Sequence, residues 1–111
     1  MARRRSVARD LARERSLVLY VLAVRCLRDG RADRARDYVR RAVEILRRNR
    51  ARRPAYYRRW VCERCLAPLV PGLTARVRLR GTRSHVLIVK RCLLCGWISR
   101  TAVERRGRPP G

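Results

Sequence analysis

Two C-x-x-C pairs constrain this chain more than any other feature. The first runs from Cys62 to Cys65 and the second from Cys92 to Cys95, with 26 residues between them. Each pair presents two sulfurs on one turn, and two such turns supply the four corners of a tetrahedron. Thiolate is a soft ligand that suits zinc better than hard cations. The spacing predicts a zinc ribbon; two disulfides or four buried free thiols are the alternatives.

The predicted site is structural and holds one zinc ion. All four ligands are protein thiolates, so no coordination position is left for a reactive water. The segment is also too short to build an adequate core alone, so zinc binding would supply its folding energy. A rubredoxin-like iron site shares the pattern, but electron carriers rarely need so basic a surface.

Net charge is the second constraint. The 31 basic residues outnumber 8 acidic ones, giving +23, and Lys90 is the only lysine. A small chain with this charge repels itself unless a polyanion neutralises it, which predicts a nucleic-acid partner. Arginine suits that partner because its planar fork grips phosphate and stacks on bases. Codon bias or adaptation to heat would explain arginine over lysine, but not the scarcity of acids.

Helical periodicity precedes the cysteines. Apolar residues recur at three- and four-residue spacing, which predicts helices over about 6–28 and 33–50. The periodic residues are Val7, Leu11, Val18 and Leu22 in the first helix and Ala35, Tyr38, Val39, Ala42, Leu46 and Asn49 in the second. Ser6 and Asp33 are the expected N-caps, and Gly30 the expected stop. A short turn containing glycine makes the pair an antiparallel hairpin within a basic unit, 1–53.

The first predicted helix is apolar almost all round between Leu17 and Val24. Two helices cannot enclose that much apolar surface, so we expect a protein partner against the hairpin. Cys26 is expected to be a small buried apolar residue of this helix. The expected partner surface comprises Leu11, Val18, Leu22, Tyr38 and Leu46.

Residues 54–61 form a predicted linker in which Tyr56, Tyr57 and Trp60 alternate with arginines. Such a pattern serves RNA contacts through stacking and phosphate pairing. Alternatively, the aromatic residues pack the joint between the two halves, with Trp60 the most buried of them. The residues alone leave both interpretations open.

Alternation predicts the strands of the ribbon, which spans 62–103 ahead of a flexible tail at 104–111. From Thr74 to Arg80, Ala75, Val77 and Leu79 share one face and arginines the other. The return strand, 85–90, is apolar on both faces and is therefore expected to be central, with a third strand over 97–103. The fold class is α+β: a two-helix hairpin, a linker and a three-stranded antiparallel zinc ribbon.

Nothing in the sequence indicates an active site in this chain. His85 is the only histidine, Glu63 and Glu104 are isolated, and no glycine-rich phosphate loop is present. No apolar run reaches the length of a membrane span, and the N-terminal segment does not have the pattern of a signal peptide. Four thiols in metal spacing suit a reducing compartment, so the expected location is the cytoplasm.

The order of these motifs resembles a known family. Each C-x-x-C turn is named a knuckle here. The chain has, in order, arginine-rich helices, a first knuckle, Leu69-Val-Pro-Gly72, an Arg-Val-Arg-Leu stretch ending at Leu79, and a second knuckle followed by Gly96. This order resembles the family of ribonuclease P subunits that includes archaeal component 4 and eukaryotic Rpp-twenty-one and Rpr-two. The resemblance covers about residues 33–100. Two departures are Leu66, where the family often has glycine, and the extra residue Val61.

The resemblance implies a non-catalytic subunit of a ribonucleoprotein that removes the 5′ leader of precursor tRNA. It implies that the RNA subunit does the chemistry with Mg²⁺ and that this chain docks on its specificity domain. It also implies a heterodimer with a small Sm-like β-barrel subunit, and assigns Cys62, Cys65, Cys92 and Cys95 as zinc ligands. A ribosomal or transcription-associated zinc-ribbon protein is the alternative. The arginines expected to face RNA are Arg58, Arg59, Arg76, Arg78, Arg80 and Arg83.

Overall fold

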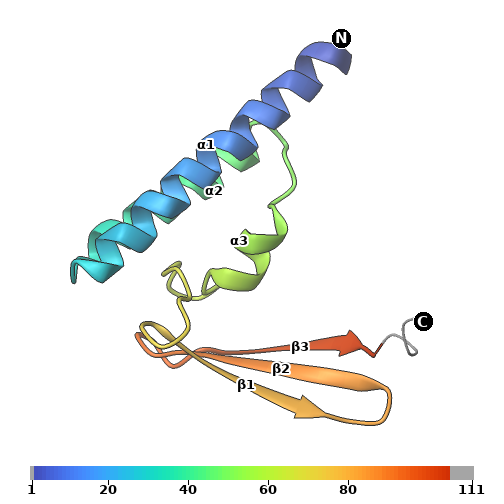
Figure 1. Ribbon diagram of the computed structural model, residues 1–111. Helices are drawn as coiled ribbons and strands as arrows, with labels where there is room; N and C mark the ends of the chain where they lie inside the picture. The colour runs from blue at the N-terminus through green and yellow to red at the C-terminus, as the bar shows by residue number, and fades with distance from the viewer. Residues whose placement is uncertain (1, 106–111) are drawn as a thin grey trace.

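The computed structural model describes residues 2–105 and has three tiers (Figure 1). A helical hairpin lies on one side, a three-stranded sheet on the other, and a short helix between them. This confirms the predicted α+β class. The elements are α1 (Ala2–Arg28), α2 (Ala32–Arg48), α3 (Ala55–Trp60), β1 (Ala75–Gly81), β2 (His85–Cys92) and β3 (Ile98–Glu104).

The helix ends differ in part from the prediction. α1 begins at Ala2, so Ser6 lies inside it and is not an N-cap. Arg31 precedes α2 without a side-chain cap, and Asp33 lies in the first turn, where its charge favours the positive helix end. Gly30 ends α1 as predicted, with a φ of 78° that glycine adopts readily. The short helix α3 occupies most of the predicted linker, and the predicted tail falls mostly on 106–111, outside the described residues.

The two long helices meet along small side chains. On α2 four residues of the predicted stripe are buried, Ala35, Val39, Ala42 and Leu46, whereas Tyr38 and Asn49 are half-buried. On α1 the buried positions are Ala12, Ser16, Ala23 and Leu27, none of which belongs to the periodic apolar set of that helix. Small residues let two helix backbones approach closely, and this leaves the larger apolar side chains of α1 on its outer side.

A cluster of tyrosines joins the hairpin to α3. The ring centroids of Tyr20, Tyr56 and Tyr57 lie 4.9–5.5 Å apart in tilted pairs. The hydroxyl of Tyr57 donates to the carbonyl oxygen of Ser16 at 2.8 Å, and that of Tyr20 donates to the carbonyl oxygen of Trp60 at 2.9 Å. Tyr57 is 2% exposed whereas Trp60 is half-buried, so Trp60 is not the most buried of the three linker aromatics. Of the two interpretations of the linker, the structure supports packing.

The sheet is antiparallel with the order β1-β2-β3, so β2 is central as predicted. Its near end, at the cysteines, packs beneath α3, and its hairpin tip extends beyond that helix (Figure 1). Leu79, near the tip, is therefore 68% exposed although its alternation with arginine predicted an inward position. Ala75, at the near end of the same face, is buried.

Lys90 ties the near end of the sheet to α3. It is buried, its ammonium donates to the carbonyl oxygen of Arg59, and its Nζ atom lies 4.8 Å from the ring centroid of Trp60. Such a cation over an aromatic face is attracted by the ring. Burial and the neighbouring charge of Arg59 lower the pKa of Lys90. The only lysine of the chain thus serves as an internal brace.

Candidate metal centre and nucleic-acid interface

The two knuckles are built on the same backbone pattern. In the first, the Leu66 N–H donates to the carbonyl oxygen of Cys62 at 2.9 Å; in the second, the Gly96 N–H donates to that of Cys92 at 2.8 Å. The Cys62 N–H donates to the carbonyl oxygen of Ala67, and the Cys92 N–H donates in the same way to that of Trp97, at 2.9 and 2.8 Å. Each turn therefore folds its own two sulfurs toward the other turn.

One residue of each knuckle has a left-handed backbone. Gly96 has a φ of 83°, and Leu66 takes the equivalent position with a φ of 63°. A leucine there is strained by roughly 1–2 kcal/mol because its Cβ approaches the carbonyl oxygen. The Leu66 side chain packs against the core of the hairpin, which offsets this strain. Leu66 therefore links the first knuckle to the core cluster that also contains Tyr57 and Val61.

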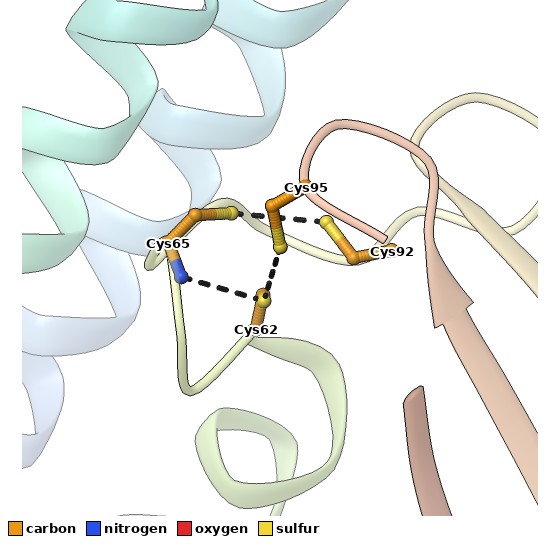
Figure 2. A group of neighbouring side chains, drawn as sticks. All are labelled: Cys62, Cys65, Cys92 and Cys95. Atoms are coloured by element: carbon orange, nitrogen blue, oxygen red, sulfur yellow. Dashed lines mark hydrogen bonds between the residues drawn. The ribbon is translucent and has the colours of Figure 1, made fainter. Parts of the chain in front are cut away.

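The four cysteines converge on one point (Figure 2). Their sulfur atoms all lie within 4.8 Å of one another, with Cys62 3.5 Å from Cys95 and Cys65 3.7 Å from Cys92. Zinc–sulfur bonds of about 2.3 Å in a tetrahedron place the sulfurs about 3.8 Å apart. The sulfur spacing matches that geometry, and the structure pairs none of the cysteines in a disulfide.

Burial and hydrogen bonding shift the pKa values of three of the cysteines in different directions. Burial raises the pKa of Cys62 to about 12 and also raises that of Cys92. Cys95 differs: burial pushes its pKa upward, but the backbone N–H of Trp97 and the neighbouring thiols lower it to about 7. A metal would bind the thiolate forms, so binding releases protons from the two buried cysteines. The set of four soft donors fits a zinc ion and leaves it no open position.

The predicted RNA-facing arginines do not gather on one surface. Alternation places Arg76, Arg78 and Arg80 on one exposed face of β1. Lys90, which contacts α3, points from the other face of the sheet, since it pairs with Val77. Arg58 and Arg59 belong to α3 and therefore lie on the opposite side of the sheet from the β1 arginines. Arg83 is exposed in the loop at the hairpin tip.

Sequence reasoning missed two arginines of the sheet. Arg91 lies directly opposite Arg76, and Arg100 lies opposite Val89, whose other partner is Arg78. Both are exposed. For Arg91 the signal was the turn centred at 83–84, since a hairpin turn fixes which residues of β1 and β2 are paired. The position of Arg100 depends on the pairing of β3, which that turn does not fix.

The predicted partner surface separates into exposed and buried residues. Leu11 and Val18 are exposed on α1, together with Val7, Leu17 and Val21. Leu22 and Tyr38 are half-buried. Leu46 is 1% exposed because it packs between the helices, so it cannot lie on a partner surface. Cys26 is half-buried against the hairpin core, less buried than expected.

The single histidine of the sequence lies at the opposite end of β2 from Cys92. His85 is exposed at the hairpin tip, where its Nδ1 lies 2.8 Å from the hydroxyl of the adjacent Ser84. This is a local contact within one turn, remote in the sheet from the cysteines. Within residues 2–105, no helix is long and apolar enough to cross a membrane.

The chain is similar to ribonuclease P proteins in sequence and in structure. Residues 15–96 match the family described as the RNAse P Rpr2/Rpp21/SNM1 subunit domain. The chain belongs to this family. This favours the ribonuclease P interpretation over the ribosomal or transcription-associated alternative.

Two members illustrate the sequence similarity. Ribonuclease P protein component 4 of Hyperthermus butylicus is 43% identical over 107 residues, which covers 96% of this chain and 93% of the relative. The Halobacterium salinarum protein of the same name is 45% identical over 83 residues, or 75% of this chain and 87% of the relative.

Two solved structures share the fold. A chain in the cryo-EM structure of archaeal ribonuclease P with mature tRNA aligns with a TM-score of 0.76 at 36% identity, covering 84% of this chain and 77% of that one. Pfu Rpp21 aligns with a TM-score of 0.60 at 37% identity, covering 83% and 99%. The Rpr2/Rpp21/SNM1 family assignment therefore rests on sequence and fold together.

Proposed function

We propose that this chain is the zinc-ribbon protein subunit of an archaeal-type ribonuclease P. It supports an RNA catalyst that removes the 5′ leader of precursor tRNA, and it contributes no catalytic residue of its own. The observation that carries this proposal is that 84% of this chain aligns with a chain of archaeal ribonuclease P. The charge of +23 agrees with it, since a subunit packed on RNA needs a basic surface.

The cysteine cluster has a supporting role in the proposed function. One Zn²⁺ bound by Cys62, Cys65, Cys92 and Cys95 would hold β1 and the entry from α3 in fixed positions. The Mg²⁺ needed for cleavage belongs to the RNA subunit. Reduced thiols need a reducing compartment, which supports a location in the cytoplasm.

The outer side of α1 is the proposed site for the Sm-like β-barrel subunit. Its exposed apolar residues are Val7, Leu11, Leu17, Val18 and Val21. Near the start of the helix, Arg4, Val7, Ala8 and Leu11 line an apolar hollow of about 350 Å³. An exposed apolar patch of this kind, rimmed by charged residues, is typical of a protein interface.

Reconstitution tests the proposed function. The zinc-loaded chain and its barrel partner are added to ribonuclease P RNA, and release of the 5′ leader from precursor tRNA is measured against Mg²⁺ concentration. We expect cleavage to proceed at a lower Mg²⁺ concentration than with RNA alone, because basic subunits relieve phosphate repulsion. Unchanged cleavage with an unchanged Mg²⁺ requirement would rule the proposal out.

A pair of variants tests the α1 interface. Val18→Asp should abolish co-purification with the barrel subunit, because it places a carboxylate within the apolar patch. Leu79→Asp is the matched control, since it introduces the same charge at a similarly exposed apolar position on the ribbon. Equal loss of binding by both variants, or by neither, would contradict an interface on α1.

A further inference from the structure

Strand pairing gathers five arginines on the face of the sheet that points away from α3. Arg76 and Arg91 pair across β1 and β2, and Arg78 and Arg100 lie on either side of Val89. All five are exposed. They are Arg76, Arg78, Arg80, Arg91 and Arg100.

One carboxylate, Glu104, shares this face by alternation, at its hairpin-tip end, but it forms no salt bridge with the five arginines. Among residues 2–105, the salt bridges lie on α1 and α2, and none involves an arginine of the sheet. Arg76 and Arg91 are directly opposite each other, an arrangement of like charges that destabilises an antiparallel pair. The face therefore gains stability when an anion binds to it.

The same face contains a small hollow. It has a volume of about 160 Å³ and is lined by Arg76, Arg78, Val89, Arg91 and Ile98. Pockets that enclose drug-sized ligands are roughly 300–1,000 Å³. This hollow is therefore large enough only for a small group, and its lining combines three arginines with two apolar side chains.

We propose that this hollow, named here the arginine hollow, holds one unpaired RNA base. The proposal rests on the proposed function and identifies the RNA element that the ribbon recognises. The base would stack on the guanidinium planes and contact Val89 and Ile98, while Arg80 and Arg100 bind the neighbouring phosphates. Paired bases in an RNA helix are stacked on one another, so a hollow lined by arginine and apolar side chains can take only a base splayed out of a loop or bulge. Arginine supplies both the stacking surface and the charge.

Two single strands with equal charge test the assignment. Fluorescence anisotropy measures binding of the full zinc-loaded chain to a ten-nucleotide oligouridylate and to an abasic strand with the same number of phosphates. Phosphate contacts alone predict equal affinities. A base held by stacking should favour oligouridylate by about 5- to 150-fold. Equal affinities would overturn the proposal.

Two residues of β3 provide a matched pair of variants. Ile98 and Val103 are both 43% exposed, but they pair with Arg91 and Val86 and so lie on opposite faces of the sheet. Ile98→Ala should reduce the preference for oligouridylate over the abasic strand, and Val103→Ala should leave it unchanged. A preference that survives Ile98→Ala intact would contradict the arginine hollow. Zinc content and circular dichroism confirm that both variants fold.

A charge-conserving variant separates stacking from phosphate binding. Arg91→Lys retains the positive charge and removes the planar guanidinium. We expect its affinity for the abasic strand to stay within about twofold, and its affinity for oligouridylate to fall toward the same value. An unchanged preference would exclude Arg91 from base stacking and so overturn the proposal.

The outcomes also separate this proposal from the proposed function. Reconstituted cleavage that responds to the chain, combined with equal binding of both strands, would remove only the arginine hollow. A base preference that depends on Ile98, combined with no effect on cleavage, would instead remove the assignment to ribonuclease P.

Discussion

The hairpin and the ribbon are stabilised in different ways. The hairpin buries a continuous stripe of apolar and small residues from two long helices. The ribbon buries only Cys62, Leu69, Ala75 and Cys92 as the core of its cluster, so half of that core consists of proposed metal ligands. We therefore expect apolar packing to stabilise the first unit and a bound metal to stabilise the second. A change in one unit should therefore leave much of the other intact.

The largest expected effect comes from breaking the metal centre. Cys65→Ser should release zinc and unfold the ribbon, since zinc binding contributes on the order of 10–16 kcal/mol in small modules. The helical circular dichroism signal should largely remain, because α1 and α2 pack without the ribbon. Zinc content and thermal melting are the measurements. Retained zinc with unchanged melting would contradict a structural metal site, and Cys26→Ser, outside the cluster, is the control.

A cavity in the hairpin should produce the complementary result. Leu46→Ala removes a side chain that is 1% exposed and should lower the free energy of unfolding of the hairpin by about 2–5 kcal/mol. Zinc content should not change. Leu11→Ala is the control, because Leu11 is exposed and its removal should change stability by no more than about 0.5 kcal/mol. Urea unfolding, monitored by circular dichroism, measures the loss of unfolding free energy in each variant. The loss should be larger for Leu46→Ala than for Leu11→Ala.

The tyrosine joint should contribute less than either unit. Tyr57→Phe removes the hydrogen bond to Ser16 and should lower the free energy of unfolding by about 1 kcal/mol at neutral pH. Burial, followed by the nearby Tyr56 and Tyr20, raises the pKa of Tyr57, so folding favours its neutral form. That stability is fully present below about pH 10, the ordinary tyrosine value, and is lost as the pH rises further.

The unfolding free energies of wild type and Tyr57→Phe, compared from pH 9 to pH 12, test whether the Tyr57 phenol is held in its neutral form. The difference in unfolding free energy between wild type and Tyr57→Phe should shrink as the pH rises above 10. Tyr56→Phe is the control, because Tyr56 is only half-buried and its hydroxyl contacts a side chain at 3.2 Å. A difference that is constant with pH would show that the Tyr57 phenol is not held in its neutral form.

The smallest change in stability is expected at the sheet arginines. Arg78→Ala should change the free energy of unfolding by no more than about 0.5 kcal/mol, since its side chain is exposed. It should nevertheless weaken binding to ribonuclease P RNA. The slope of log binding constant against log salt concentration should become shallower by about one unit for each phosphate that Arg78 neutralises. Arg41→Ala, on α2, is the control. An unchanged slope would assign Arg78 to a solvated strand face.

The parts of the fold that were predictable are those where apolar and polar residues contrast sharply. On α2, Val39 and Leu46 stand among arginines, and periodicity placed both on the stripe that is buried, although Leu46 was also expected on the partner surface. On α1 the apolar residues surround the helix, so periodicity selected the large exposed side chains and missed Ala12 and Ser16. Burial there is decided by how closely the helices approach, which the pattern of a single helix does not reveal.

The same distinction applies to the site. The cysteine cluster follows from spacing alone, because each knuckle is a local turn. The arginine hollow depends on cross-strand register, which a single strand cannot specify, so Arg91 and Arg100 were missed. Lys90 was also missed as a brace, since its partners on α3 are distant in sequence.

The position of Lys90 has a consequence for chemical labelling. The chain has no second lysine, so an amine-reactive reagent can attach only to the N-terminal amine and to Lys90. The latter amine is covered by Trp60 and bound to the Arg59 carbonyl, so acylation requires α3 to separate from the sheet. The rate of modification at Lys90, followed by mass spectrometry, would therefore measure how often that joint opens, with the N-terminal amine as the internal reference.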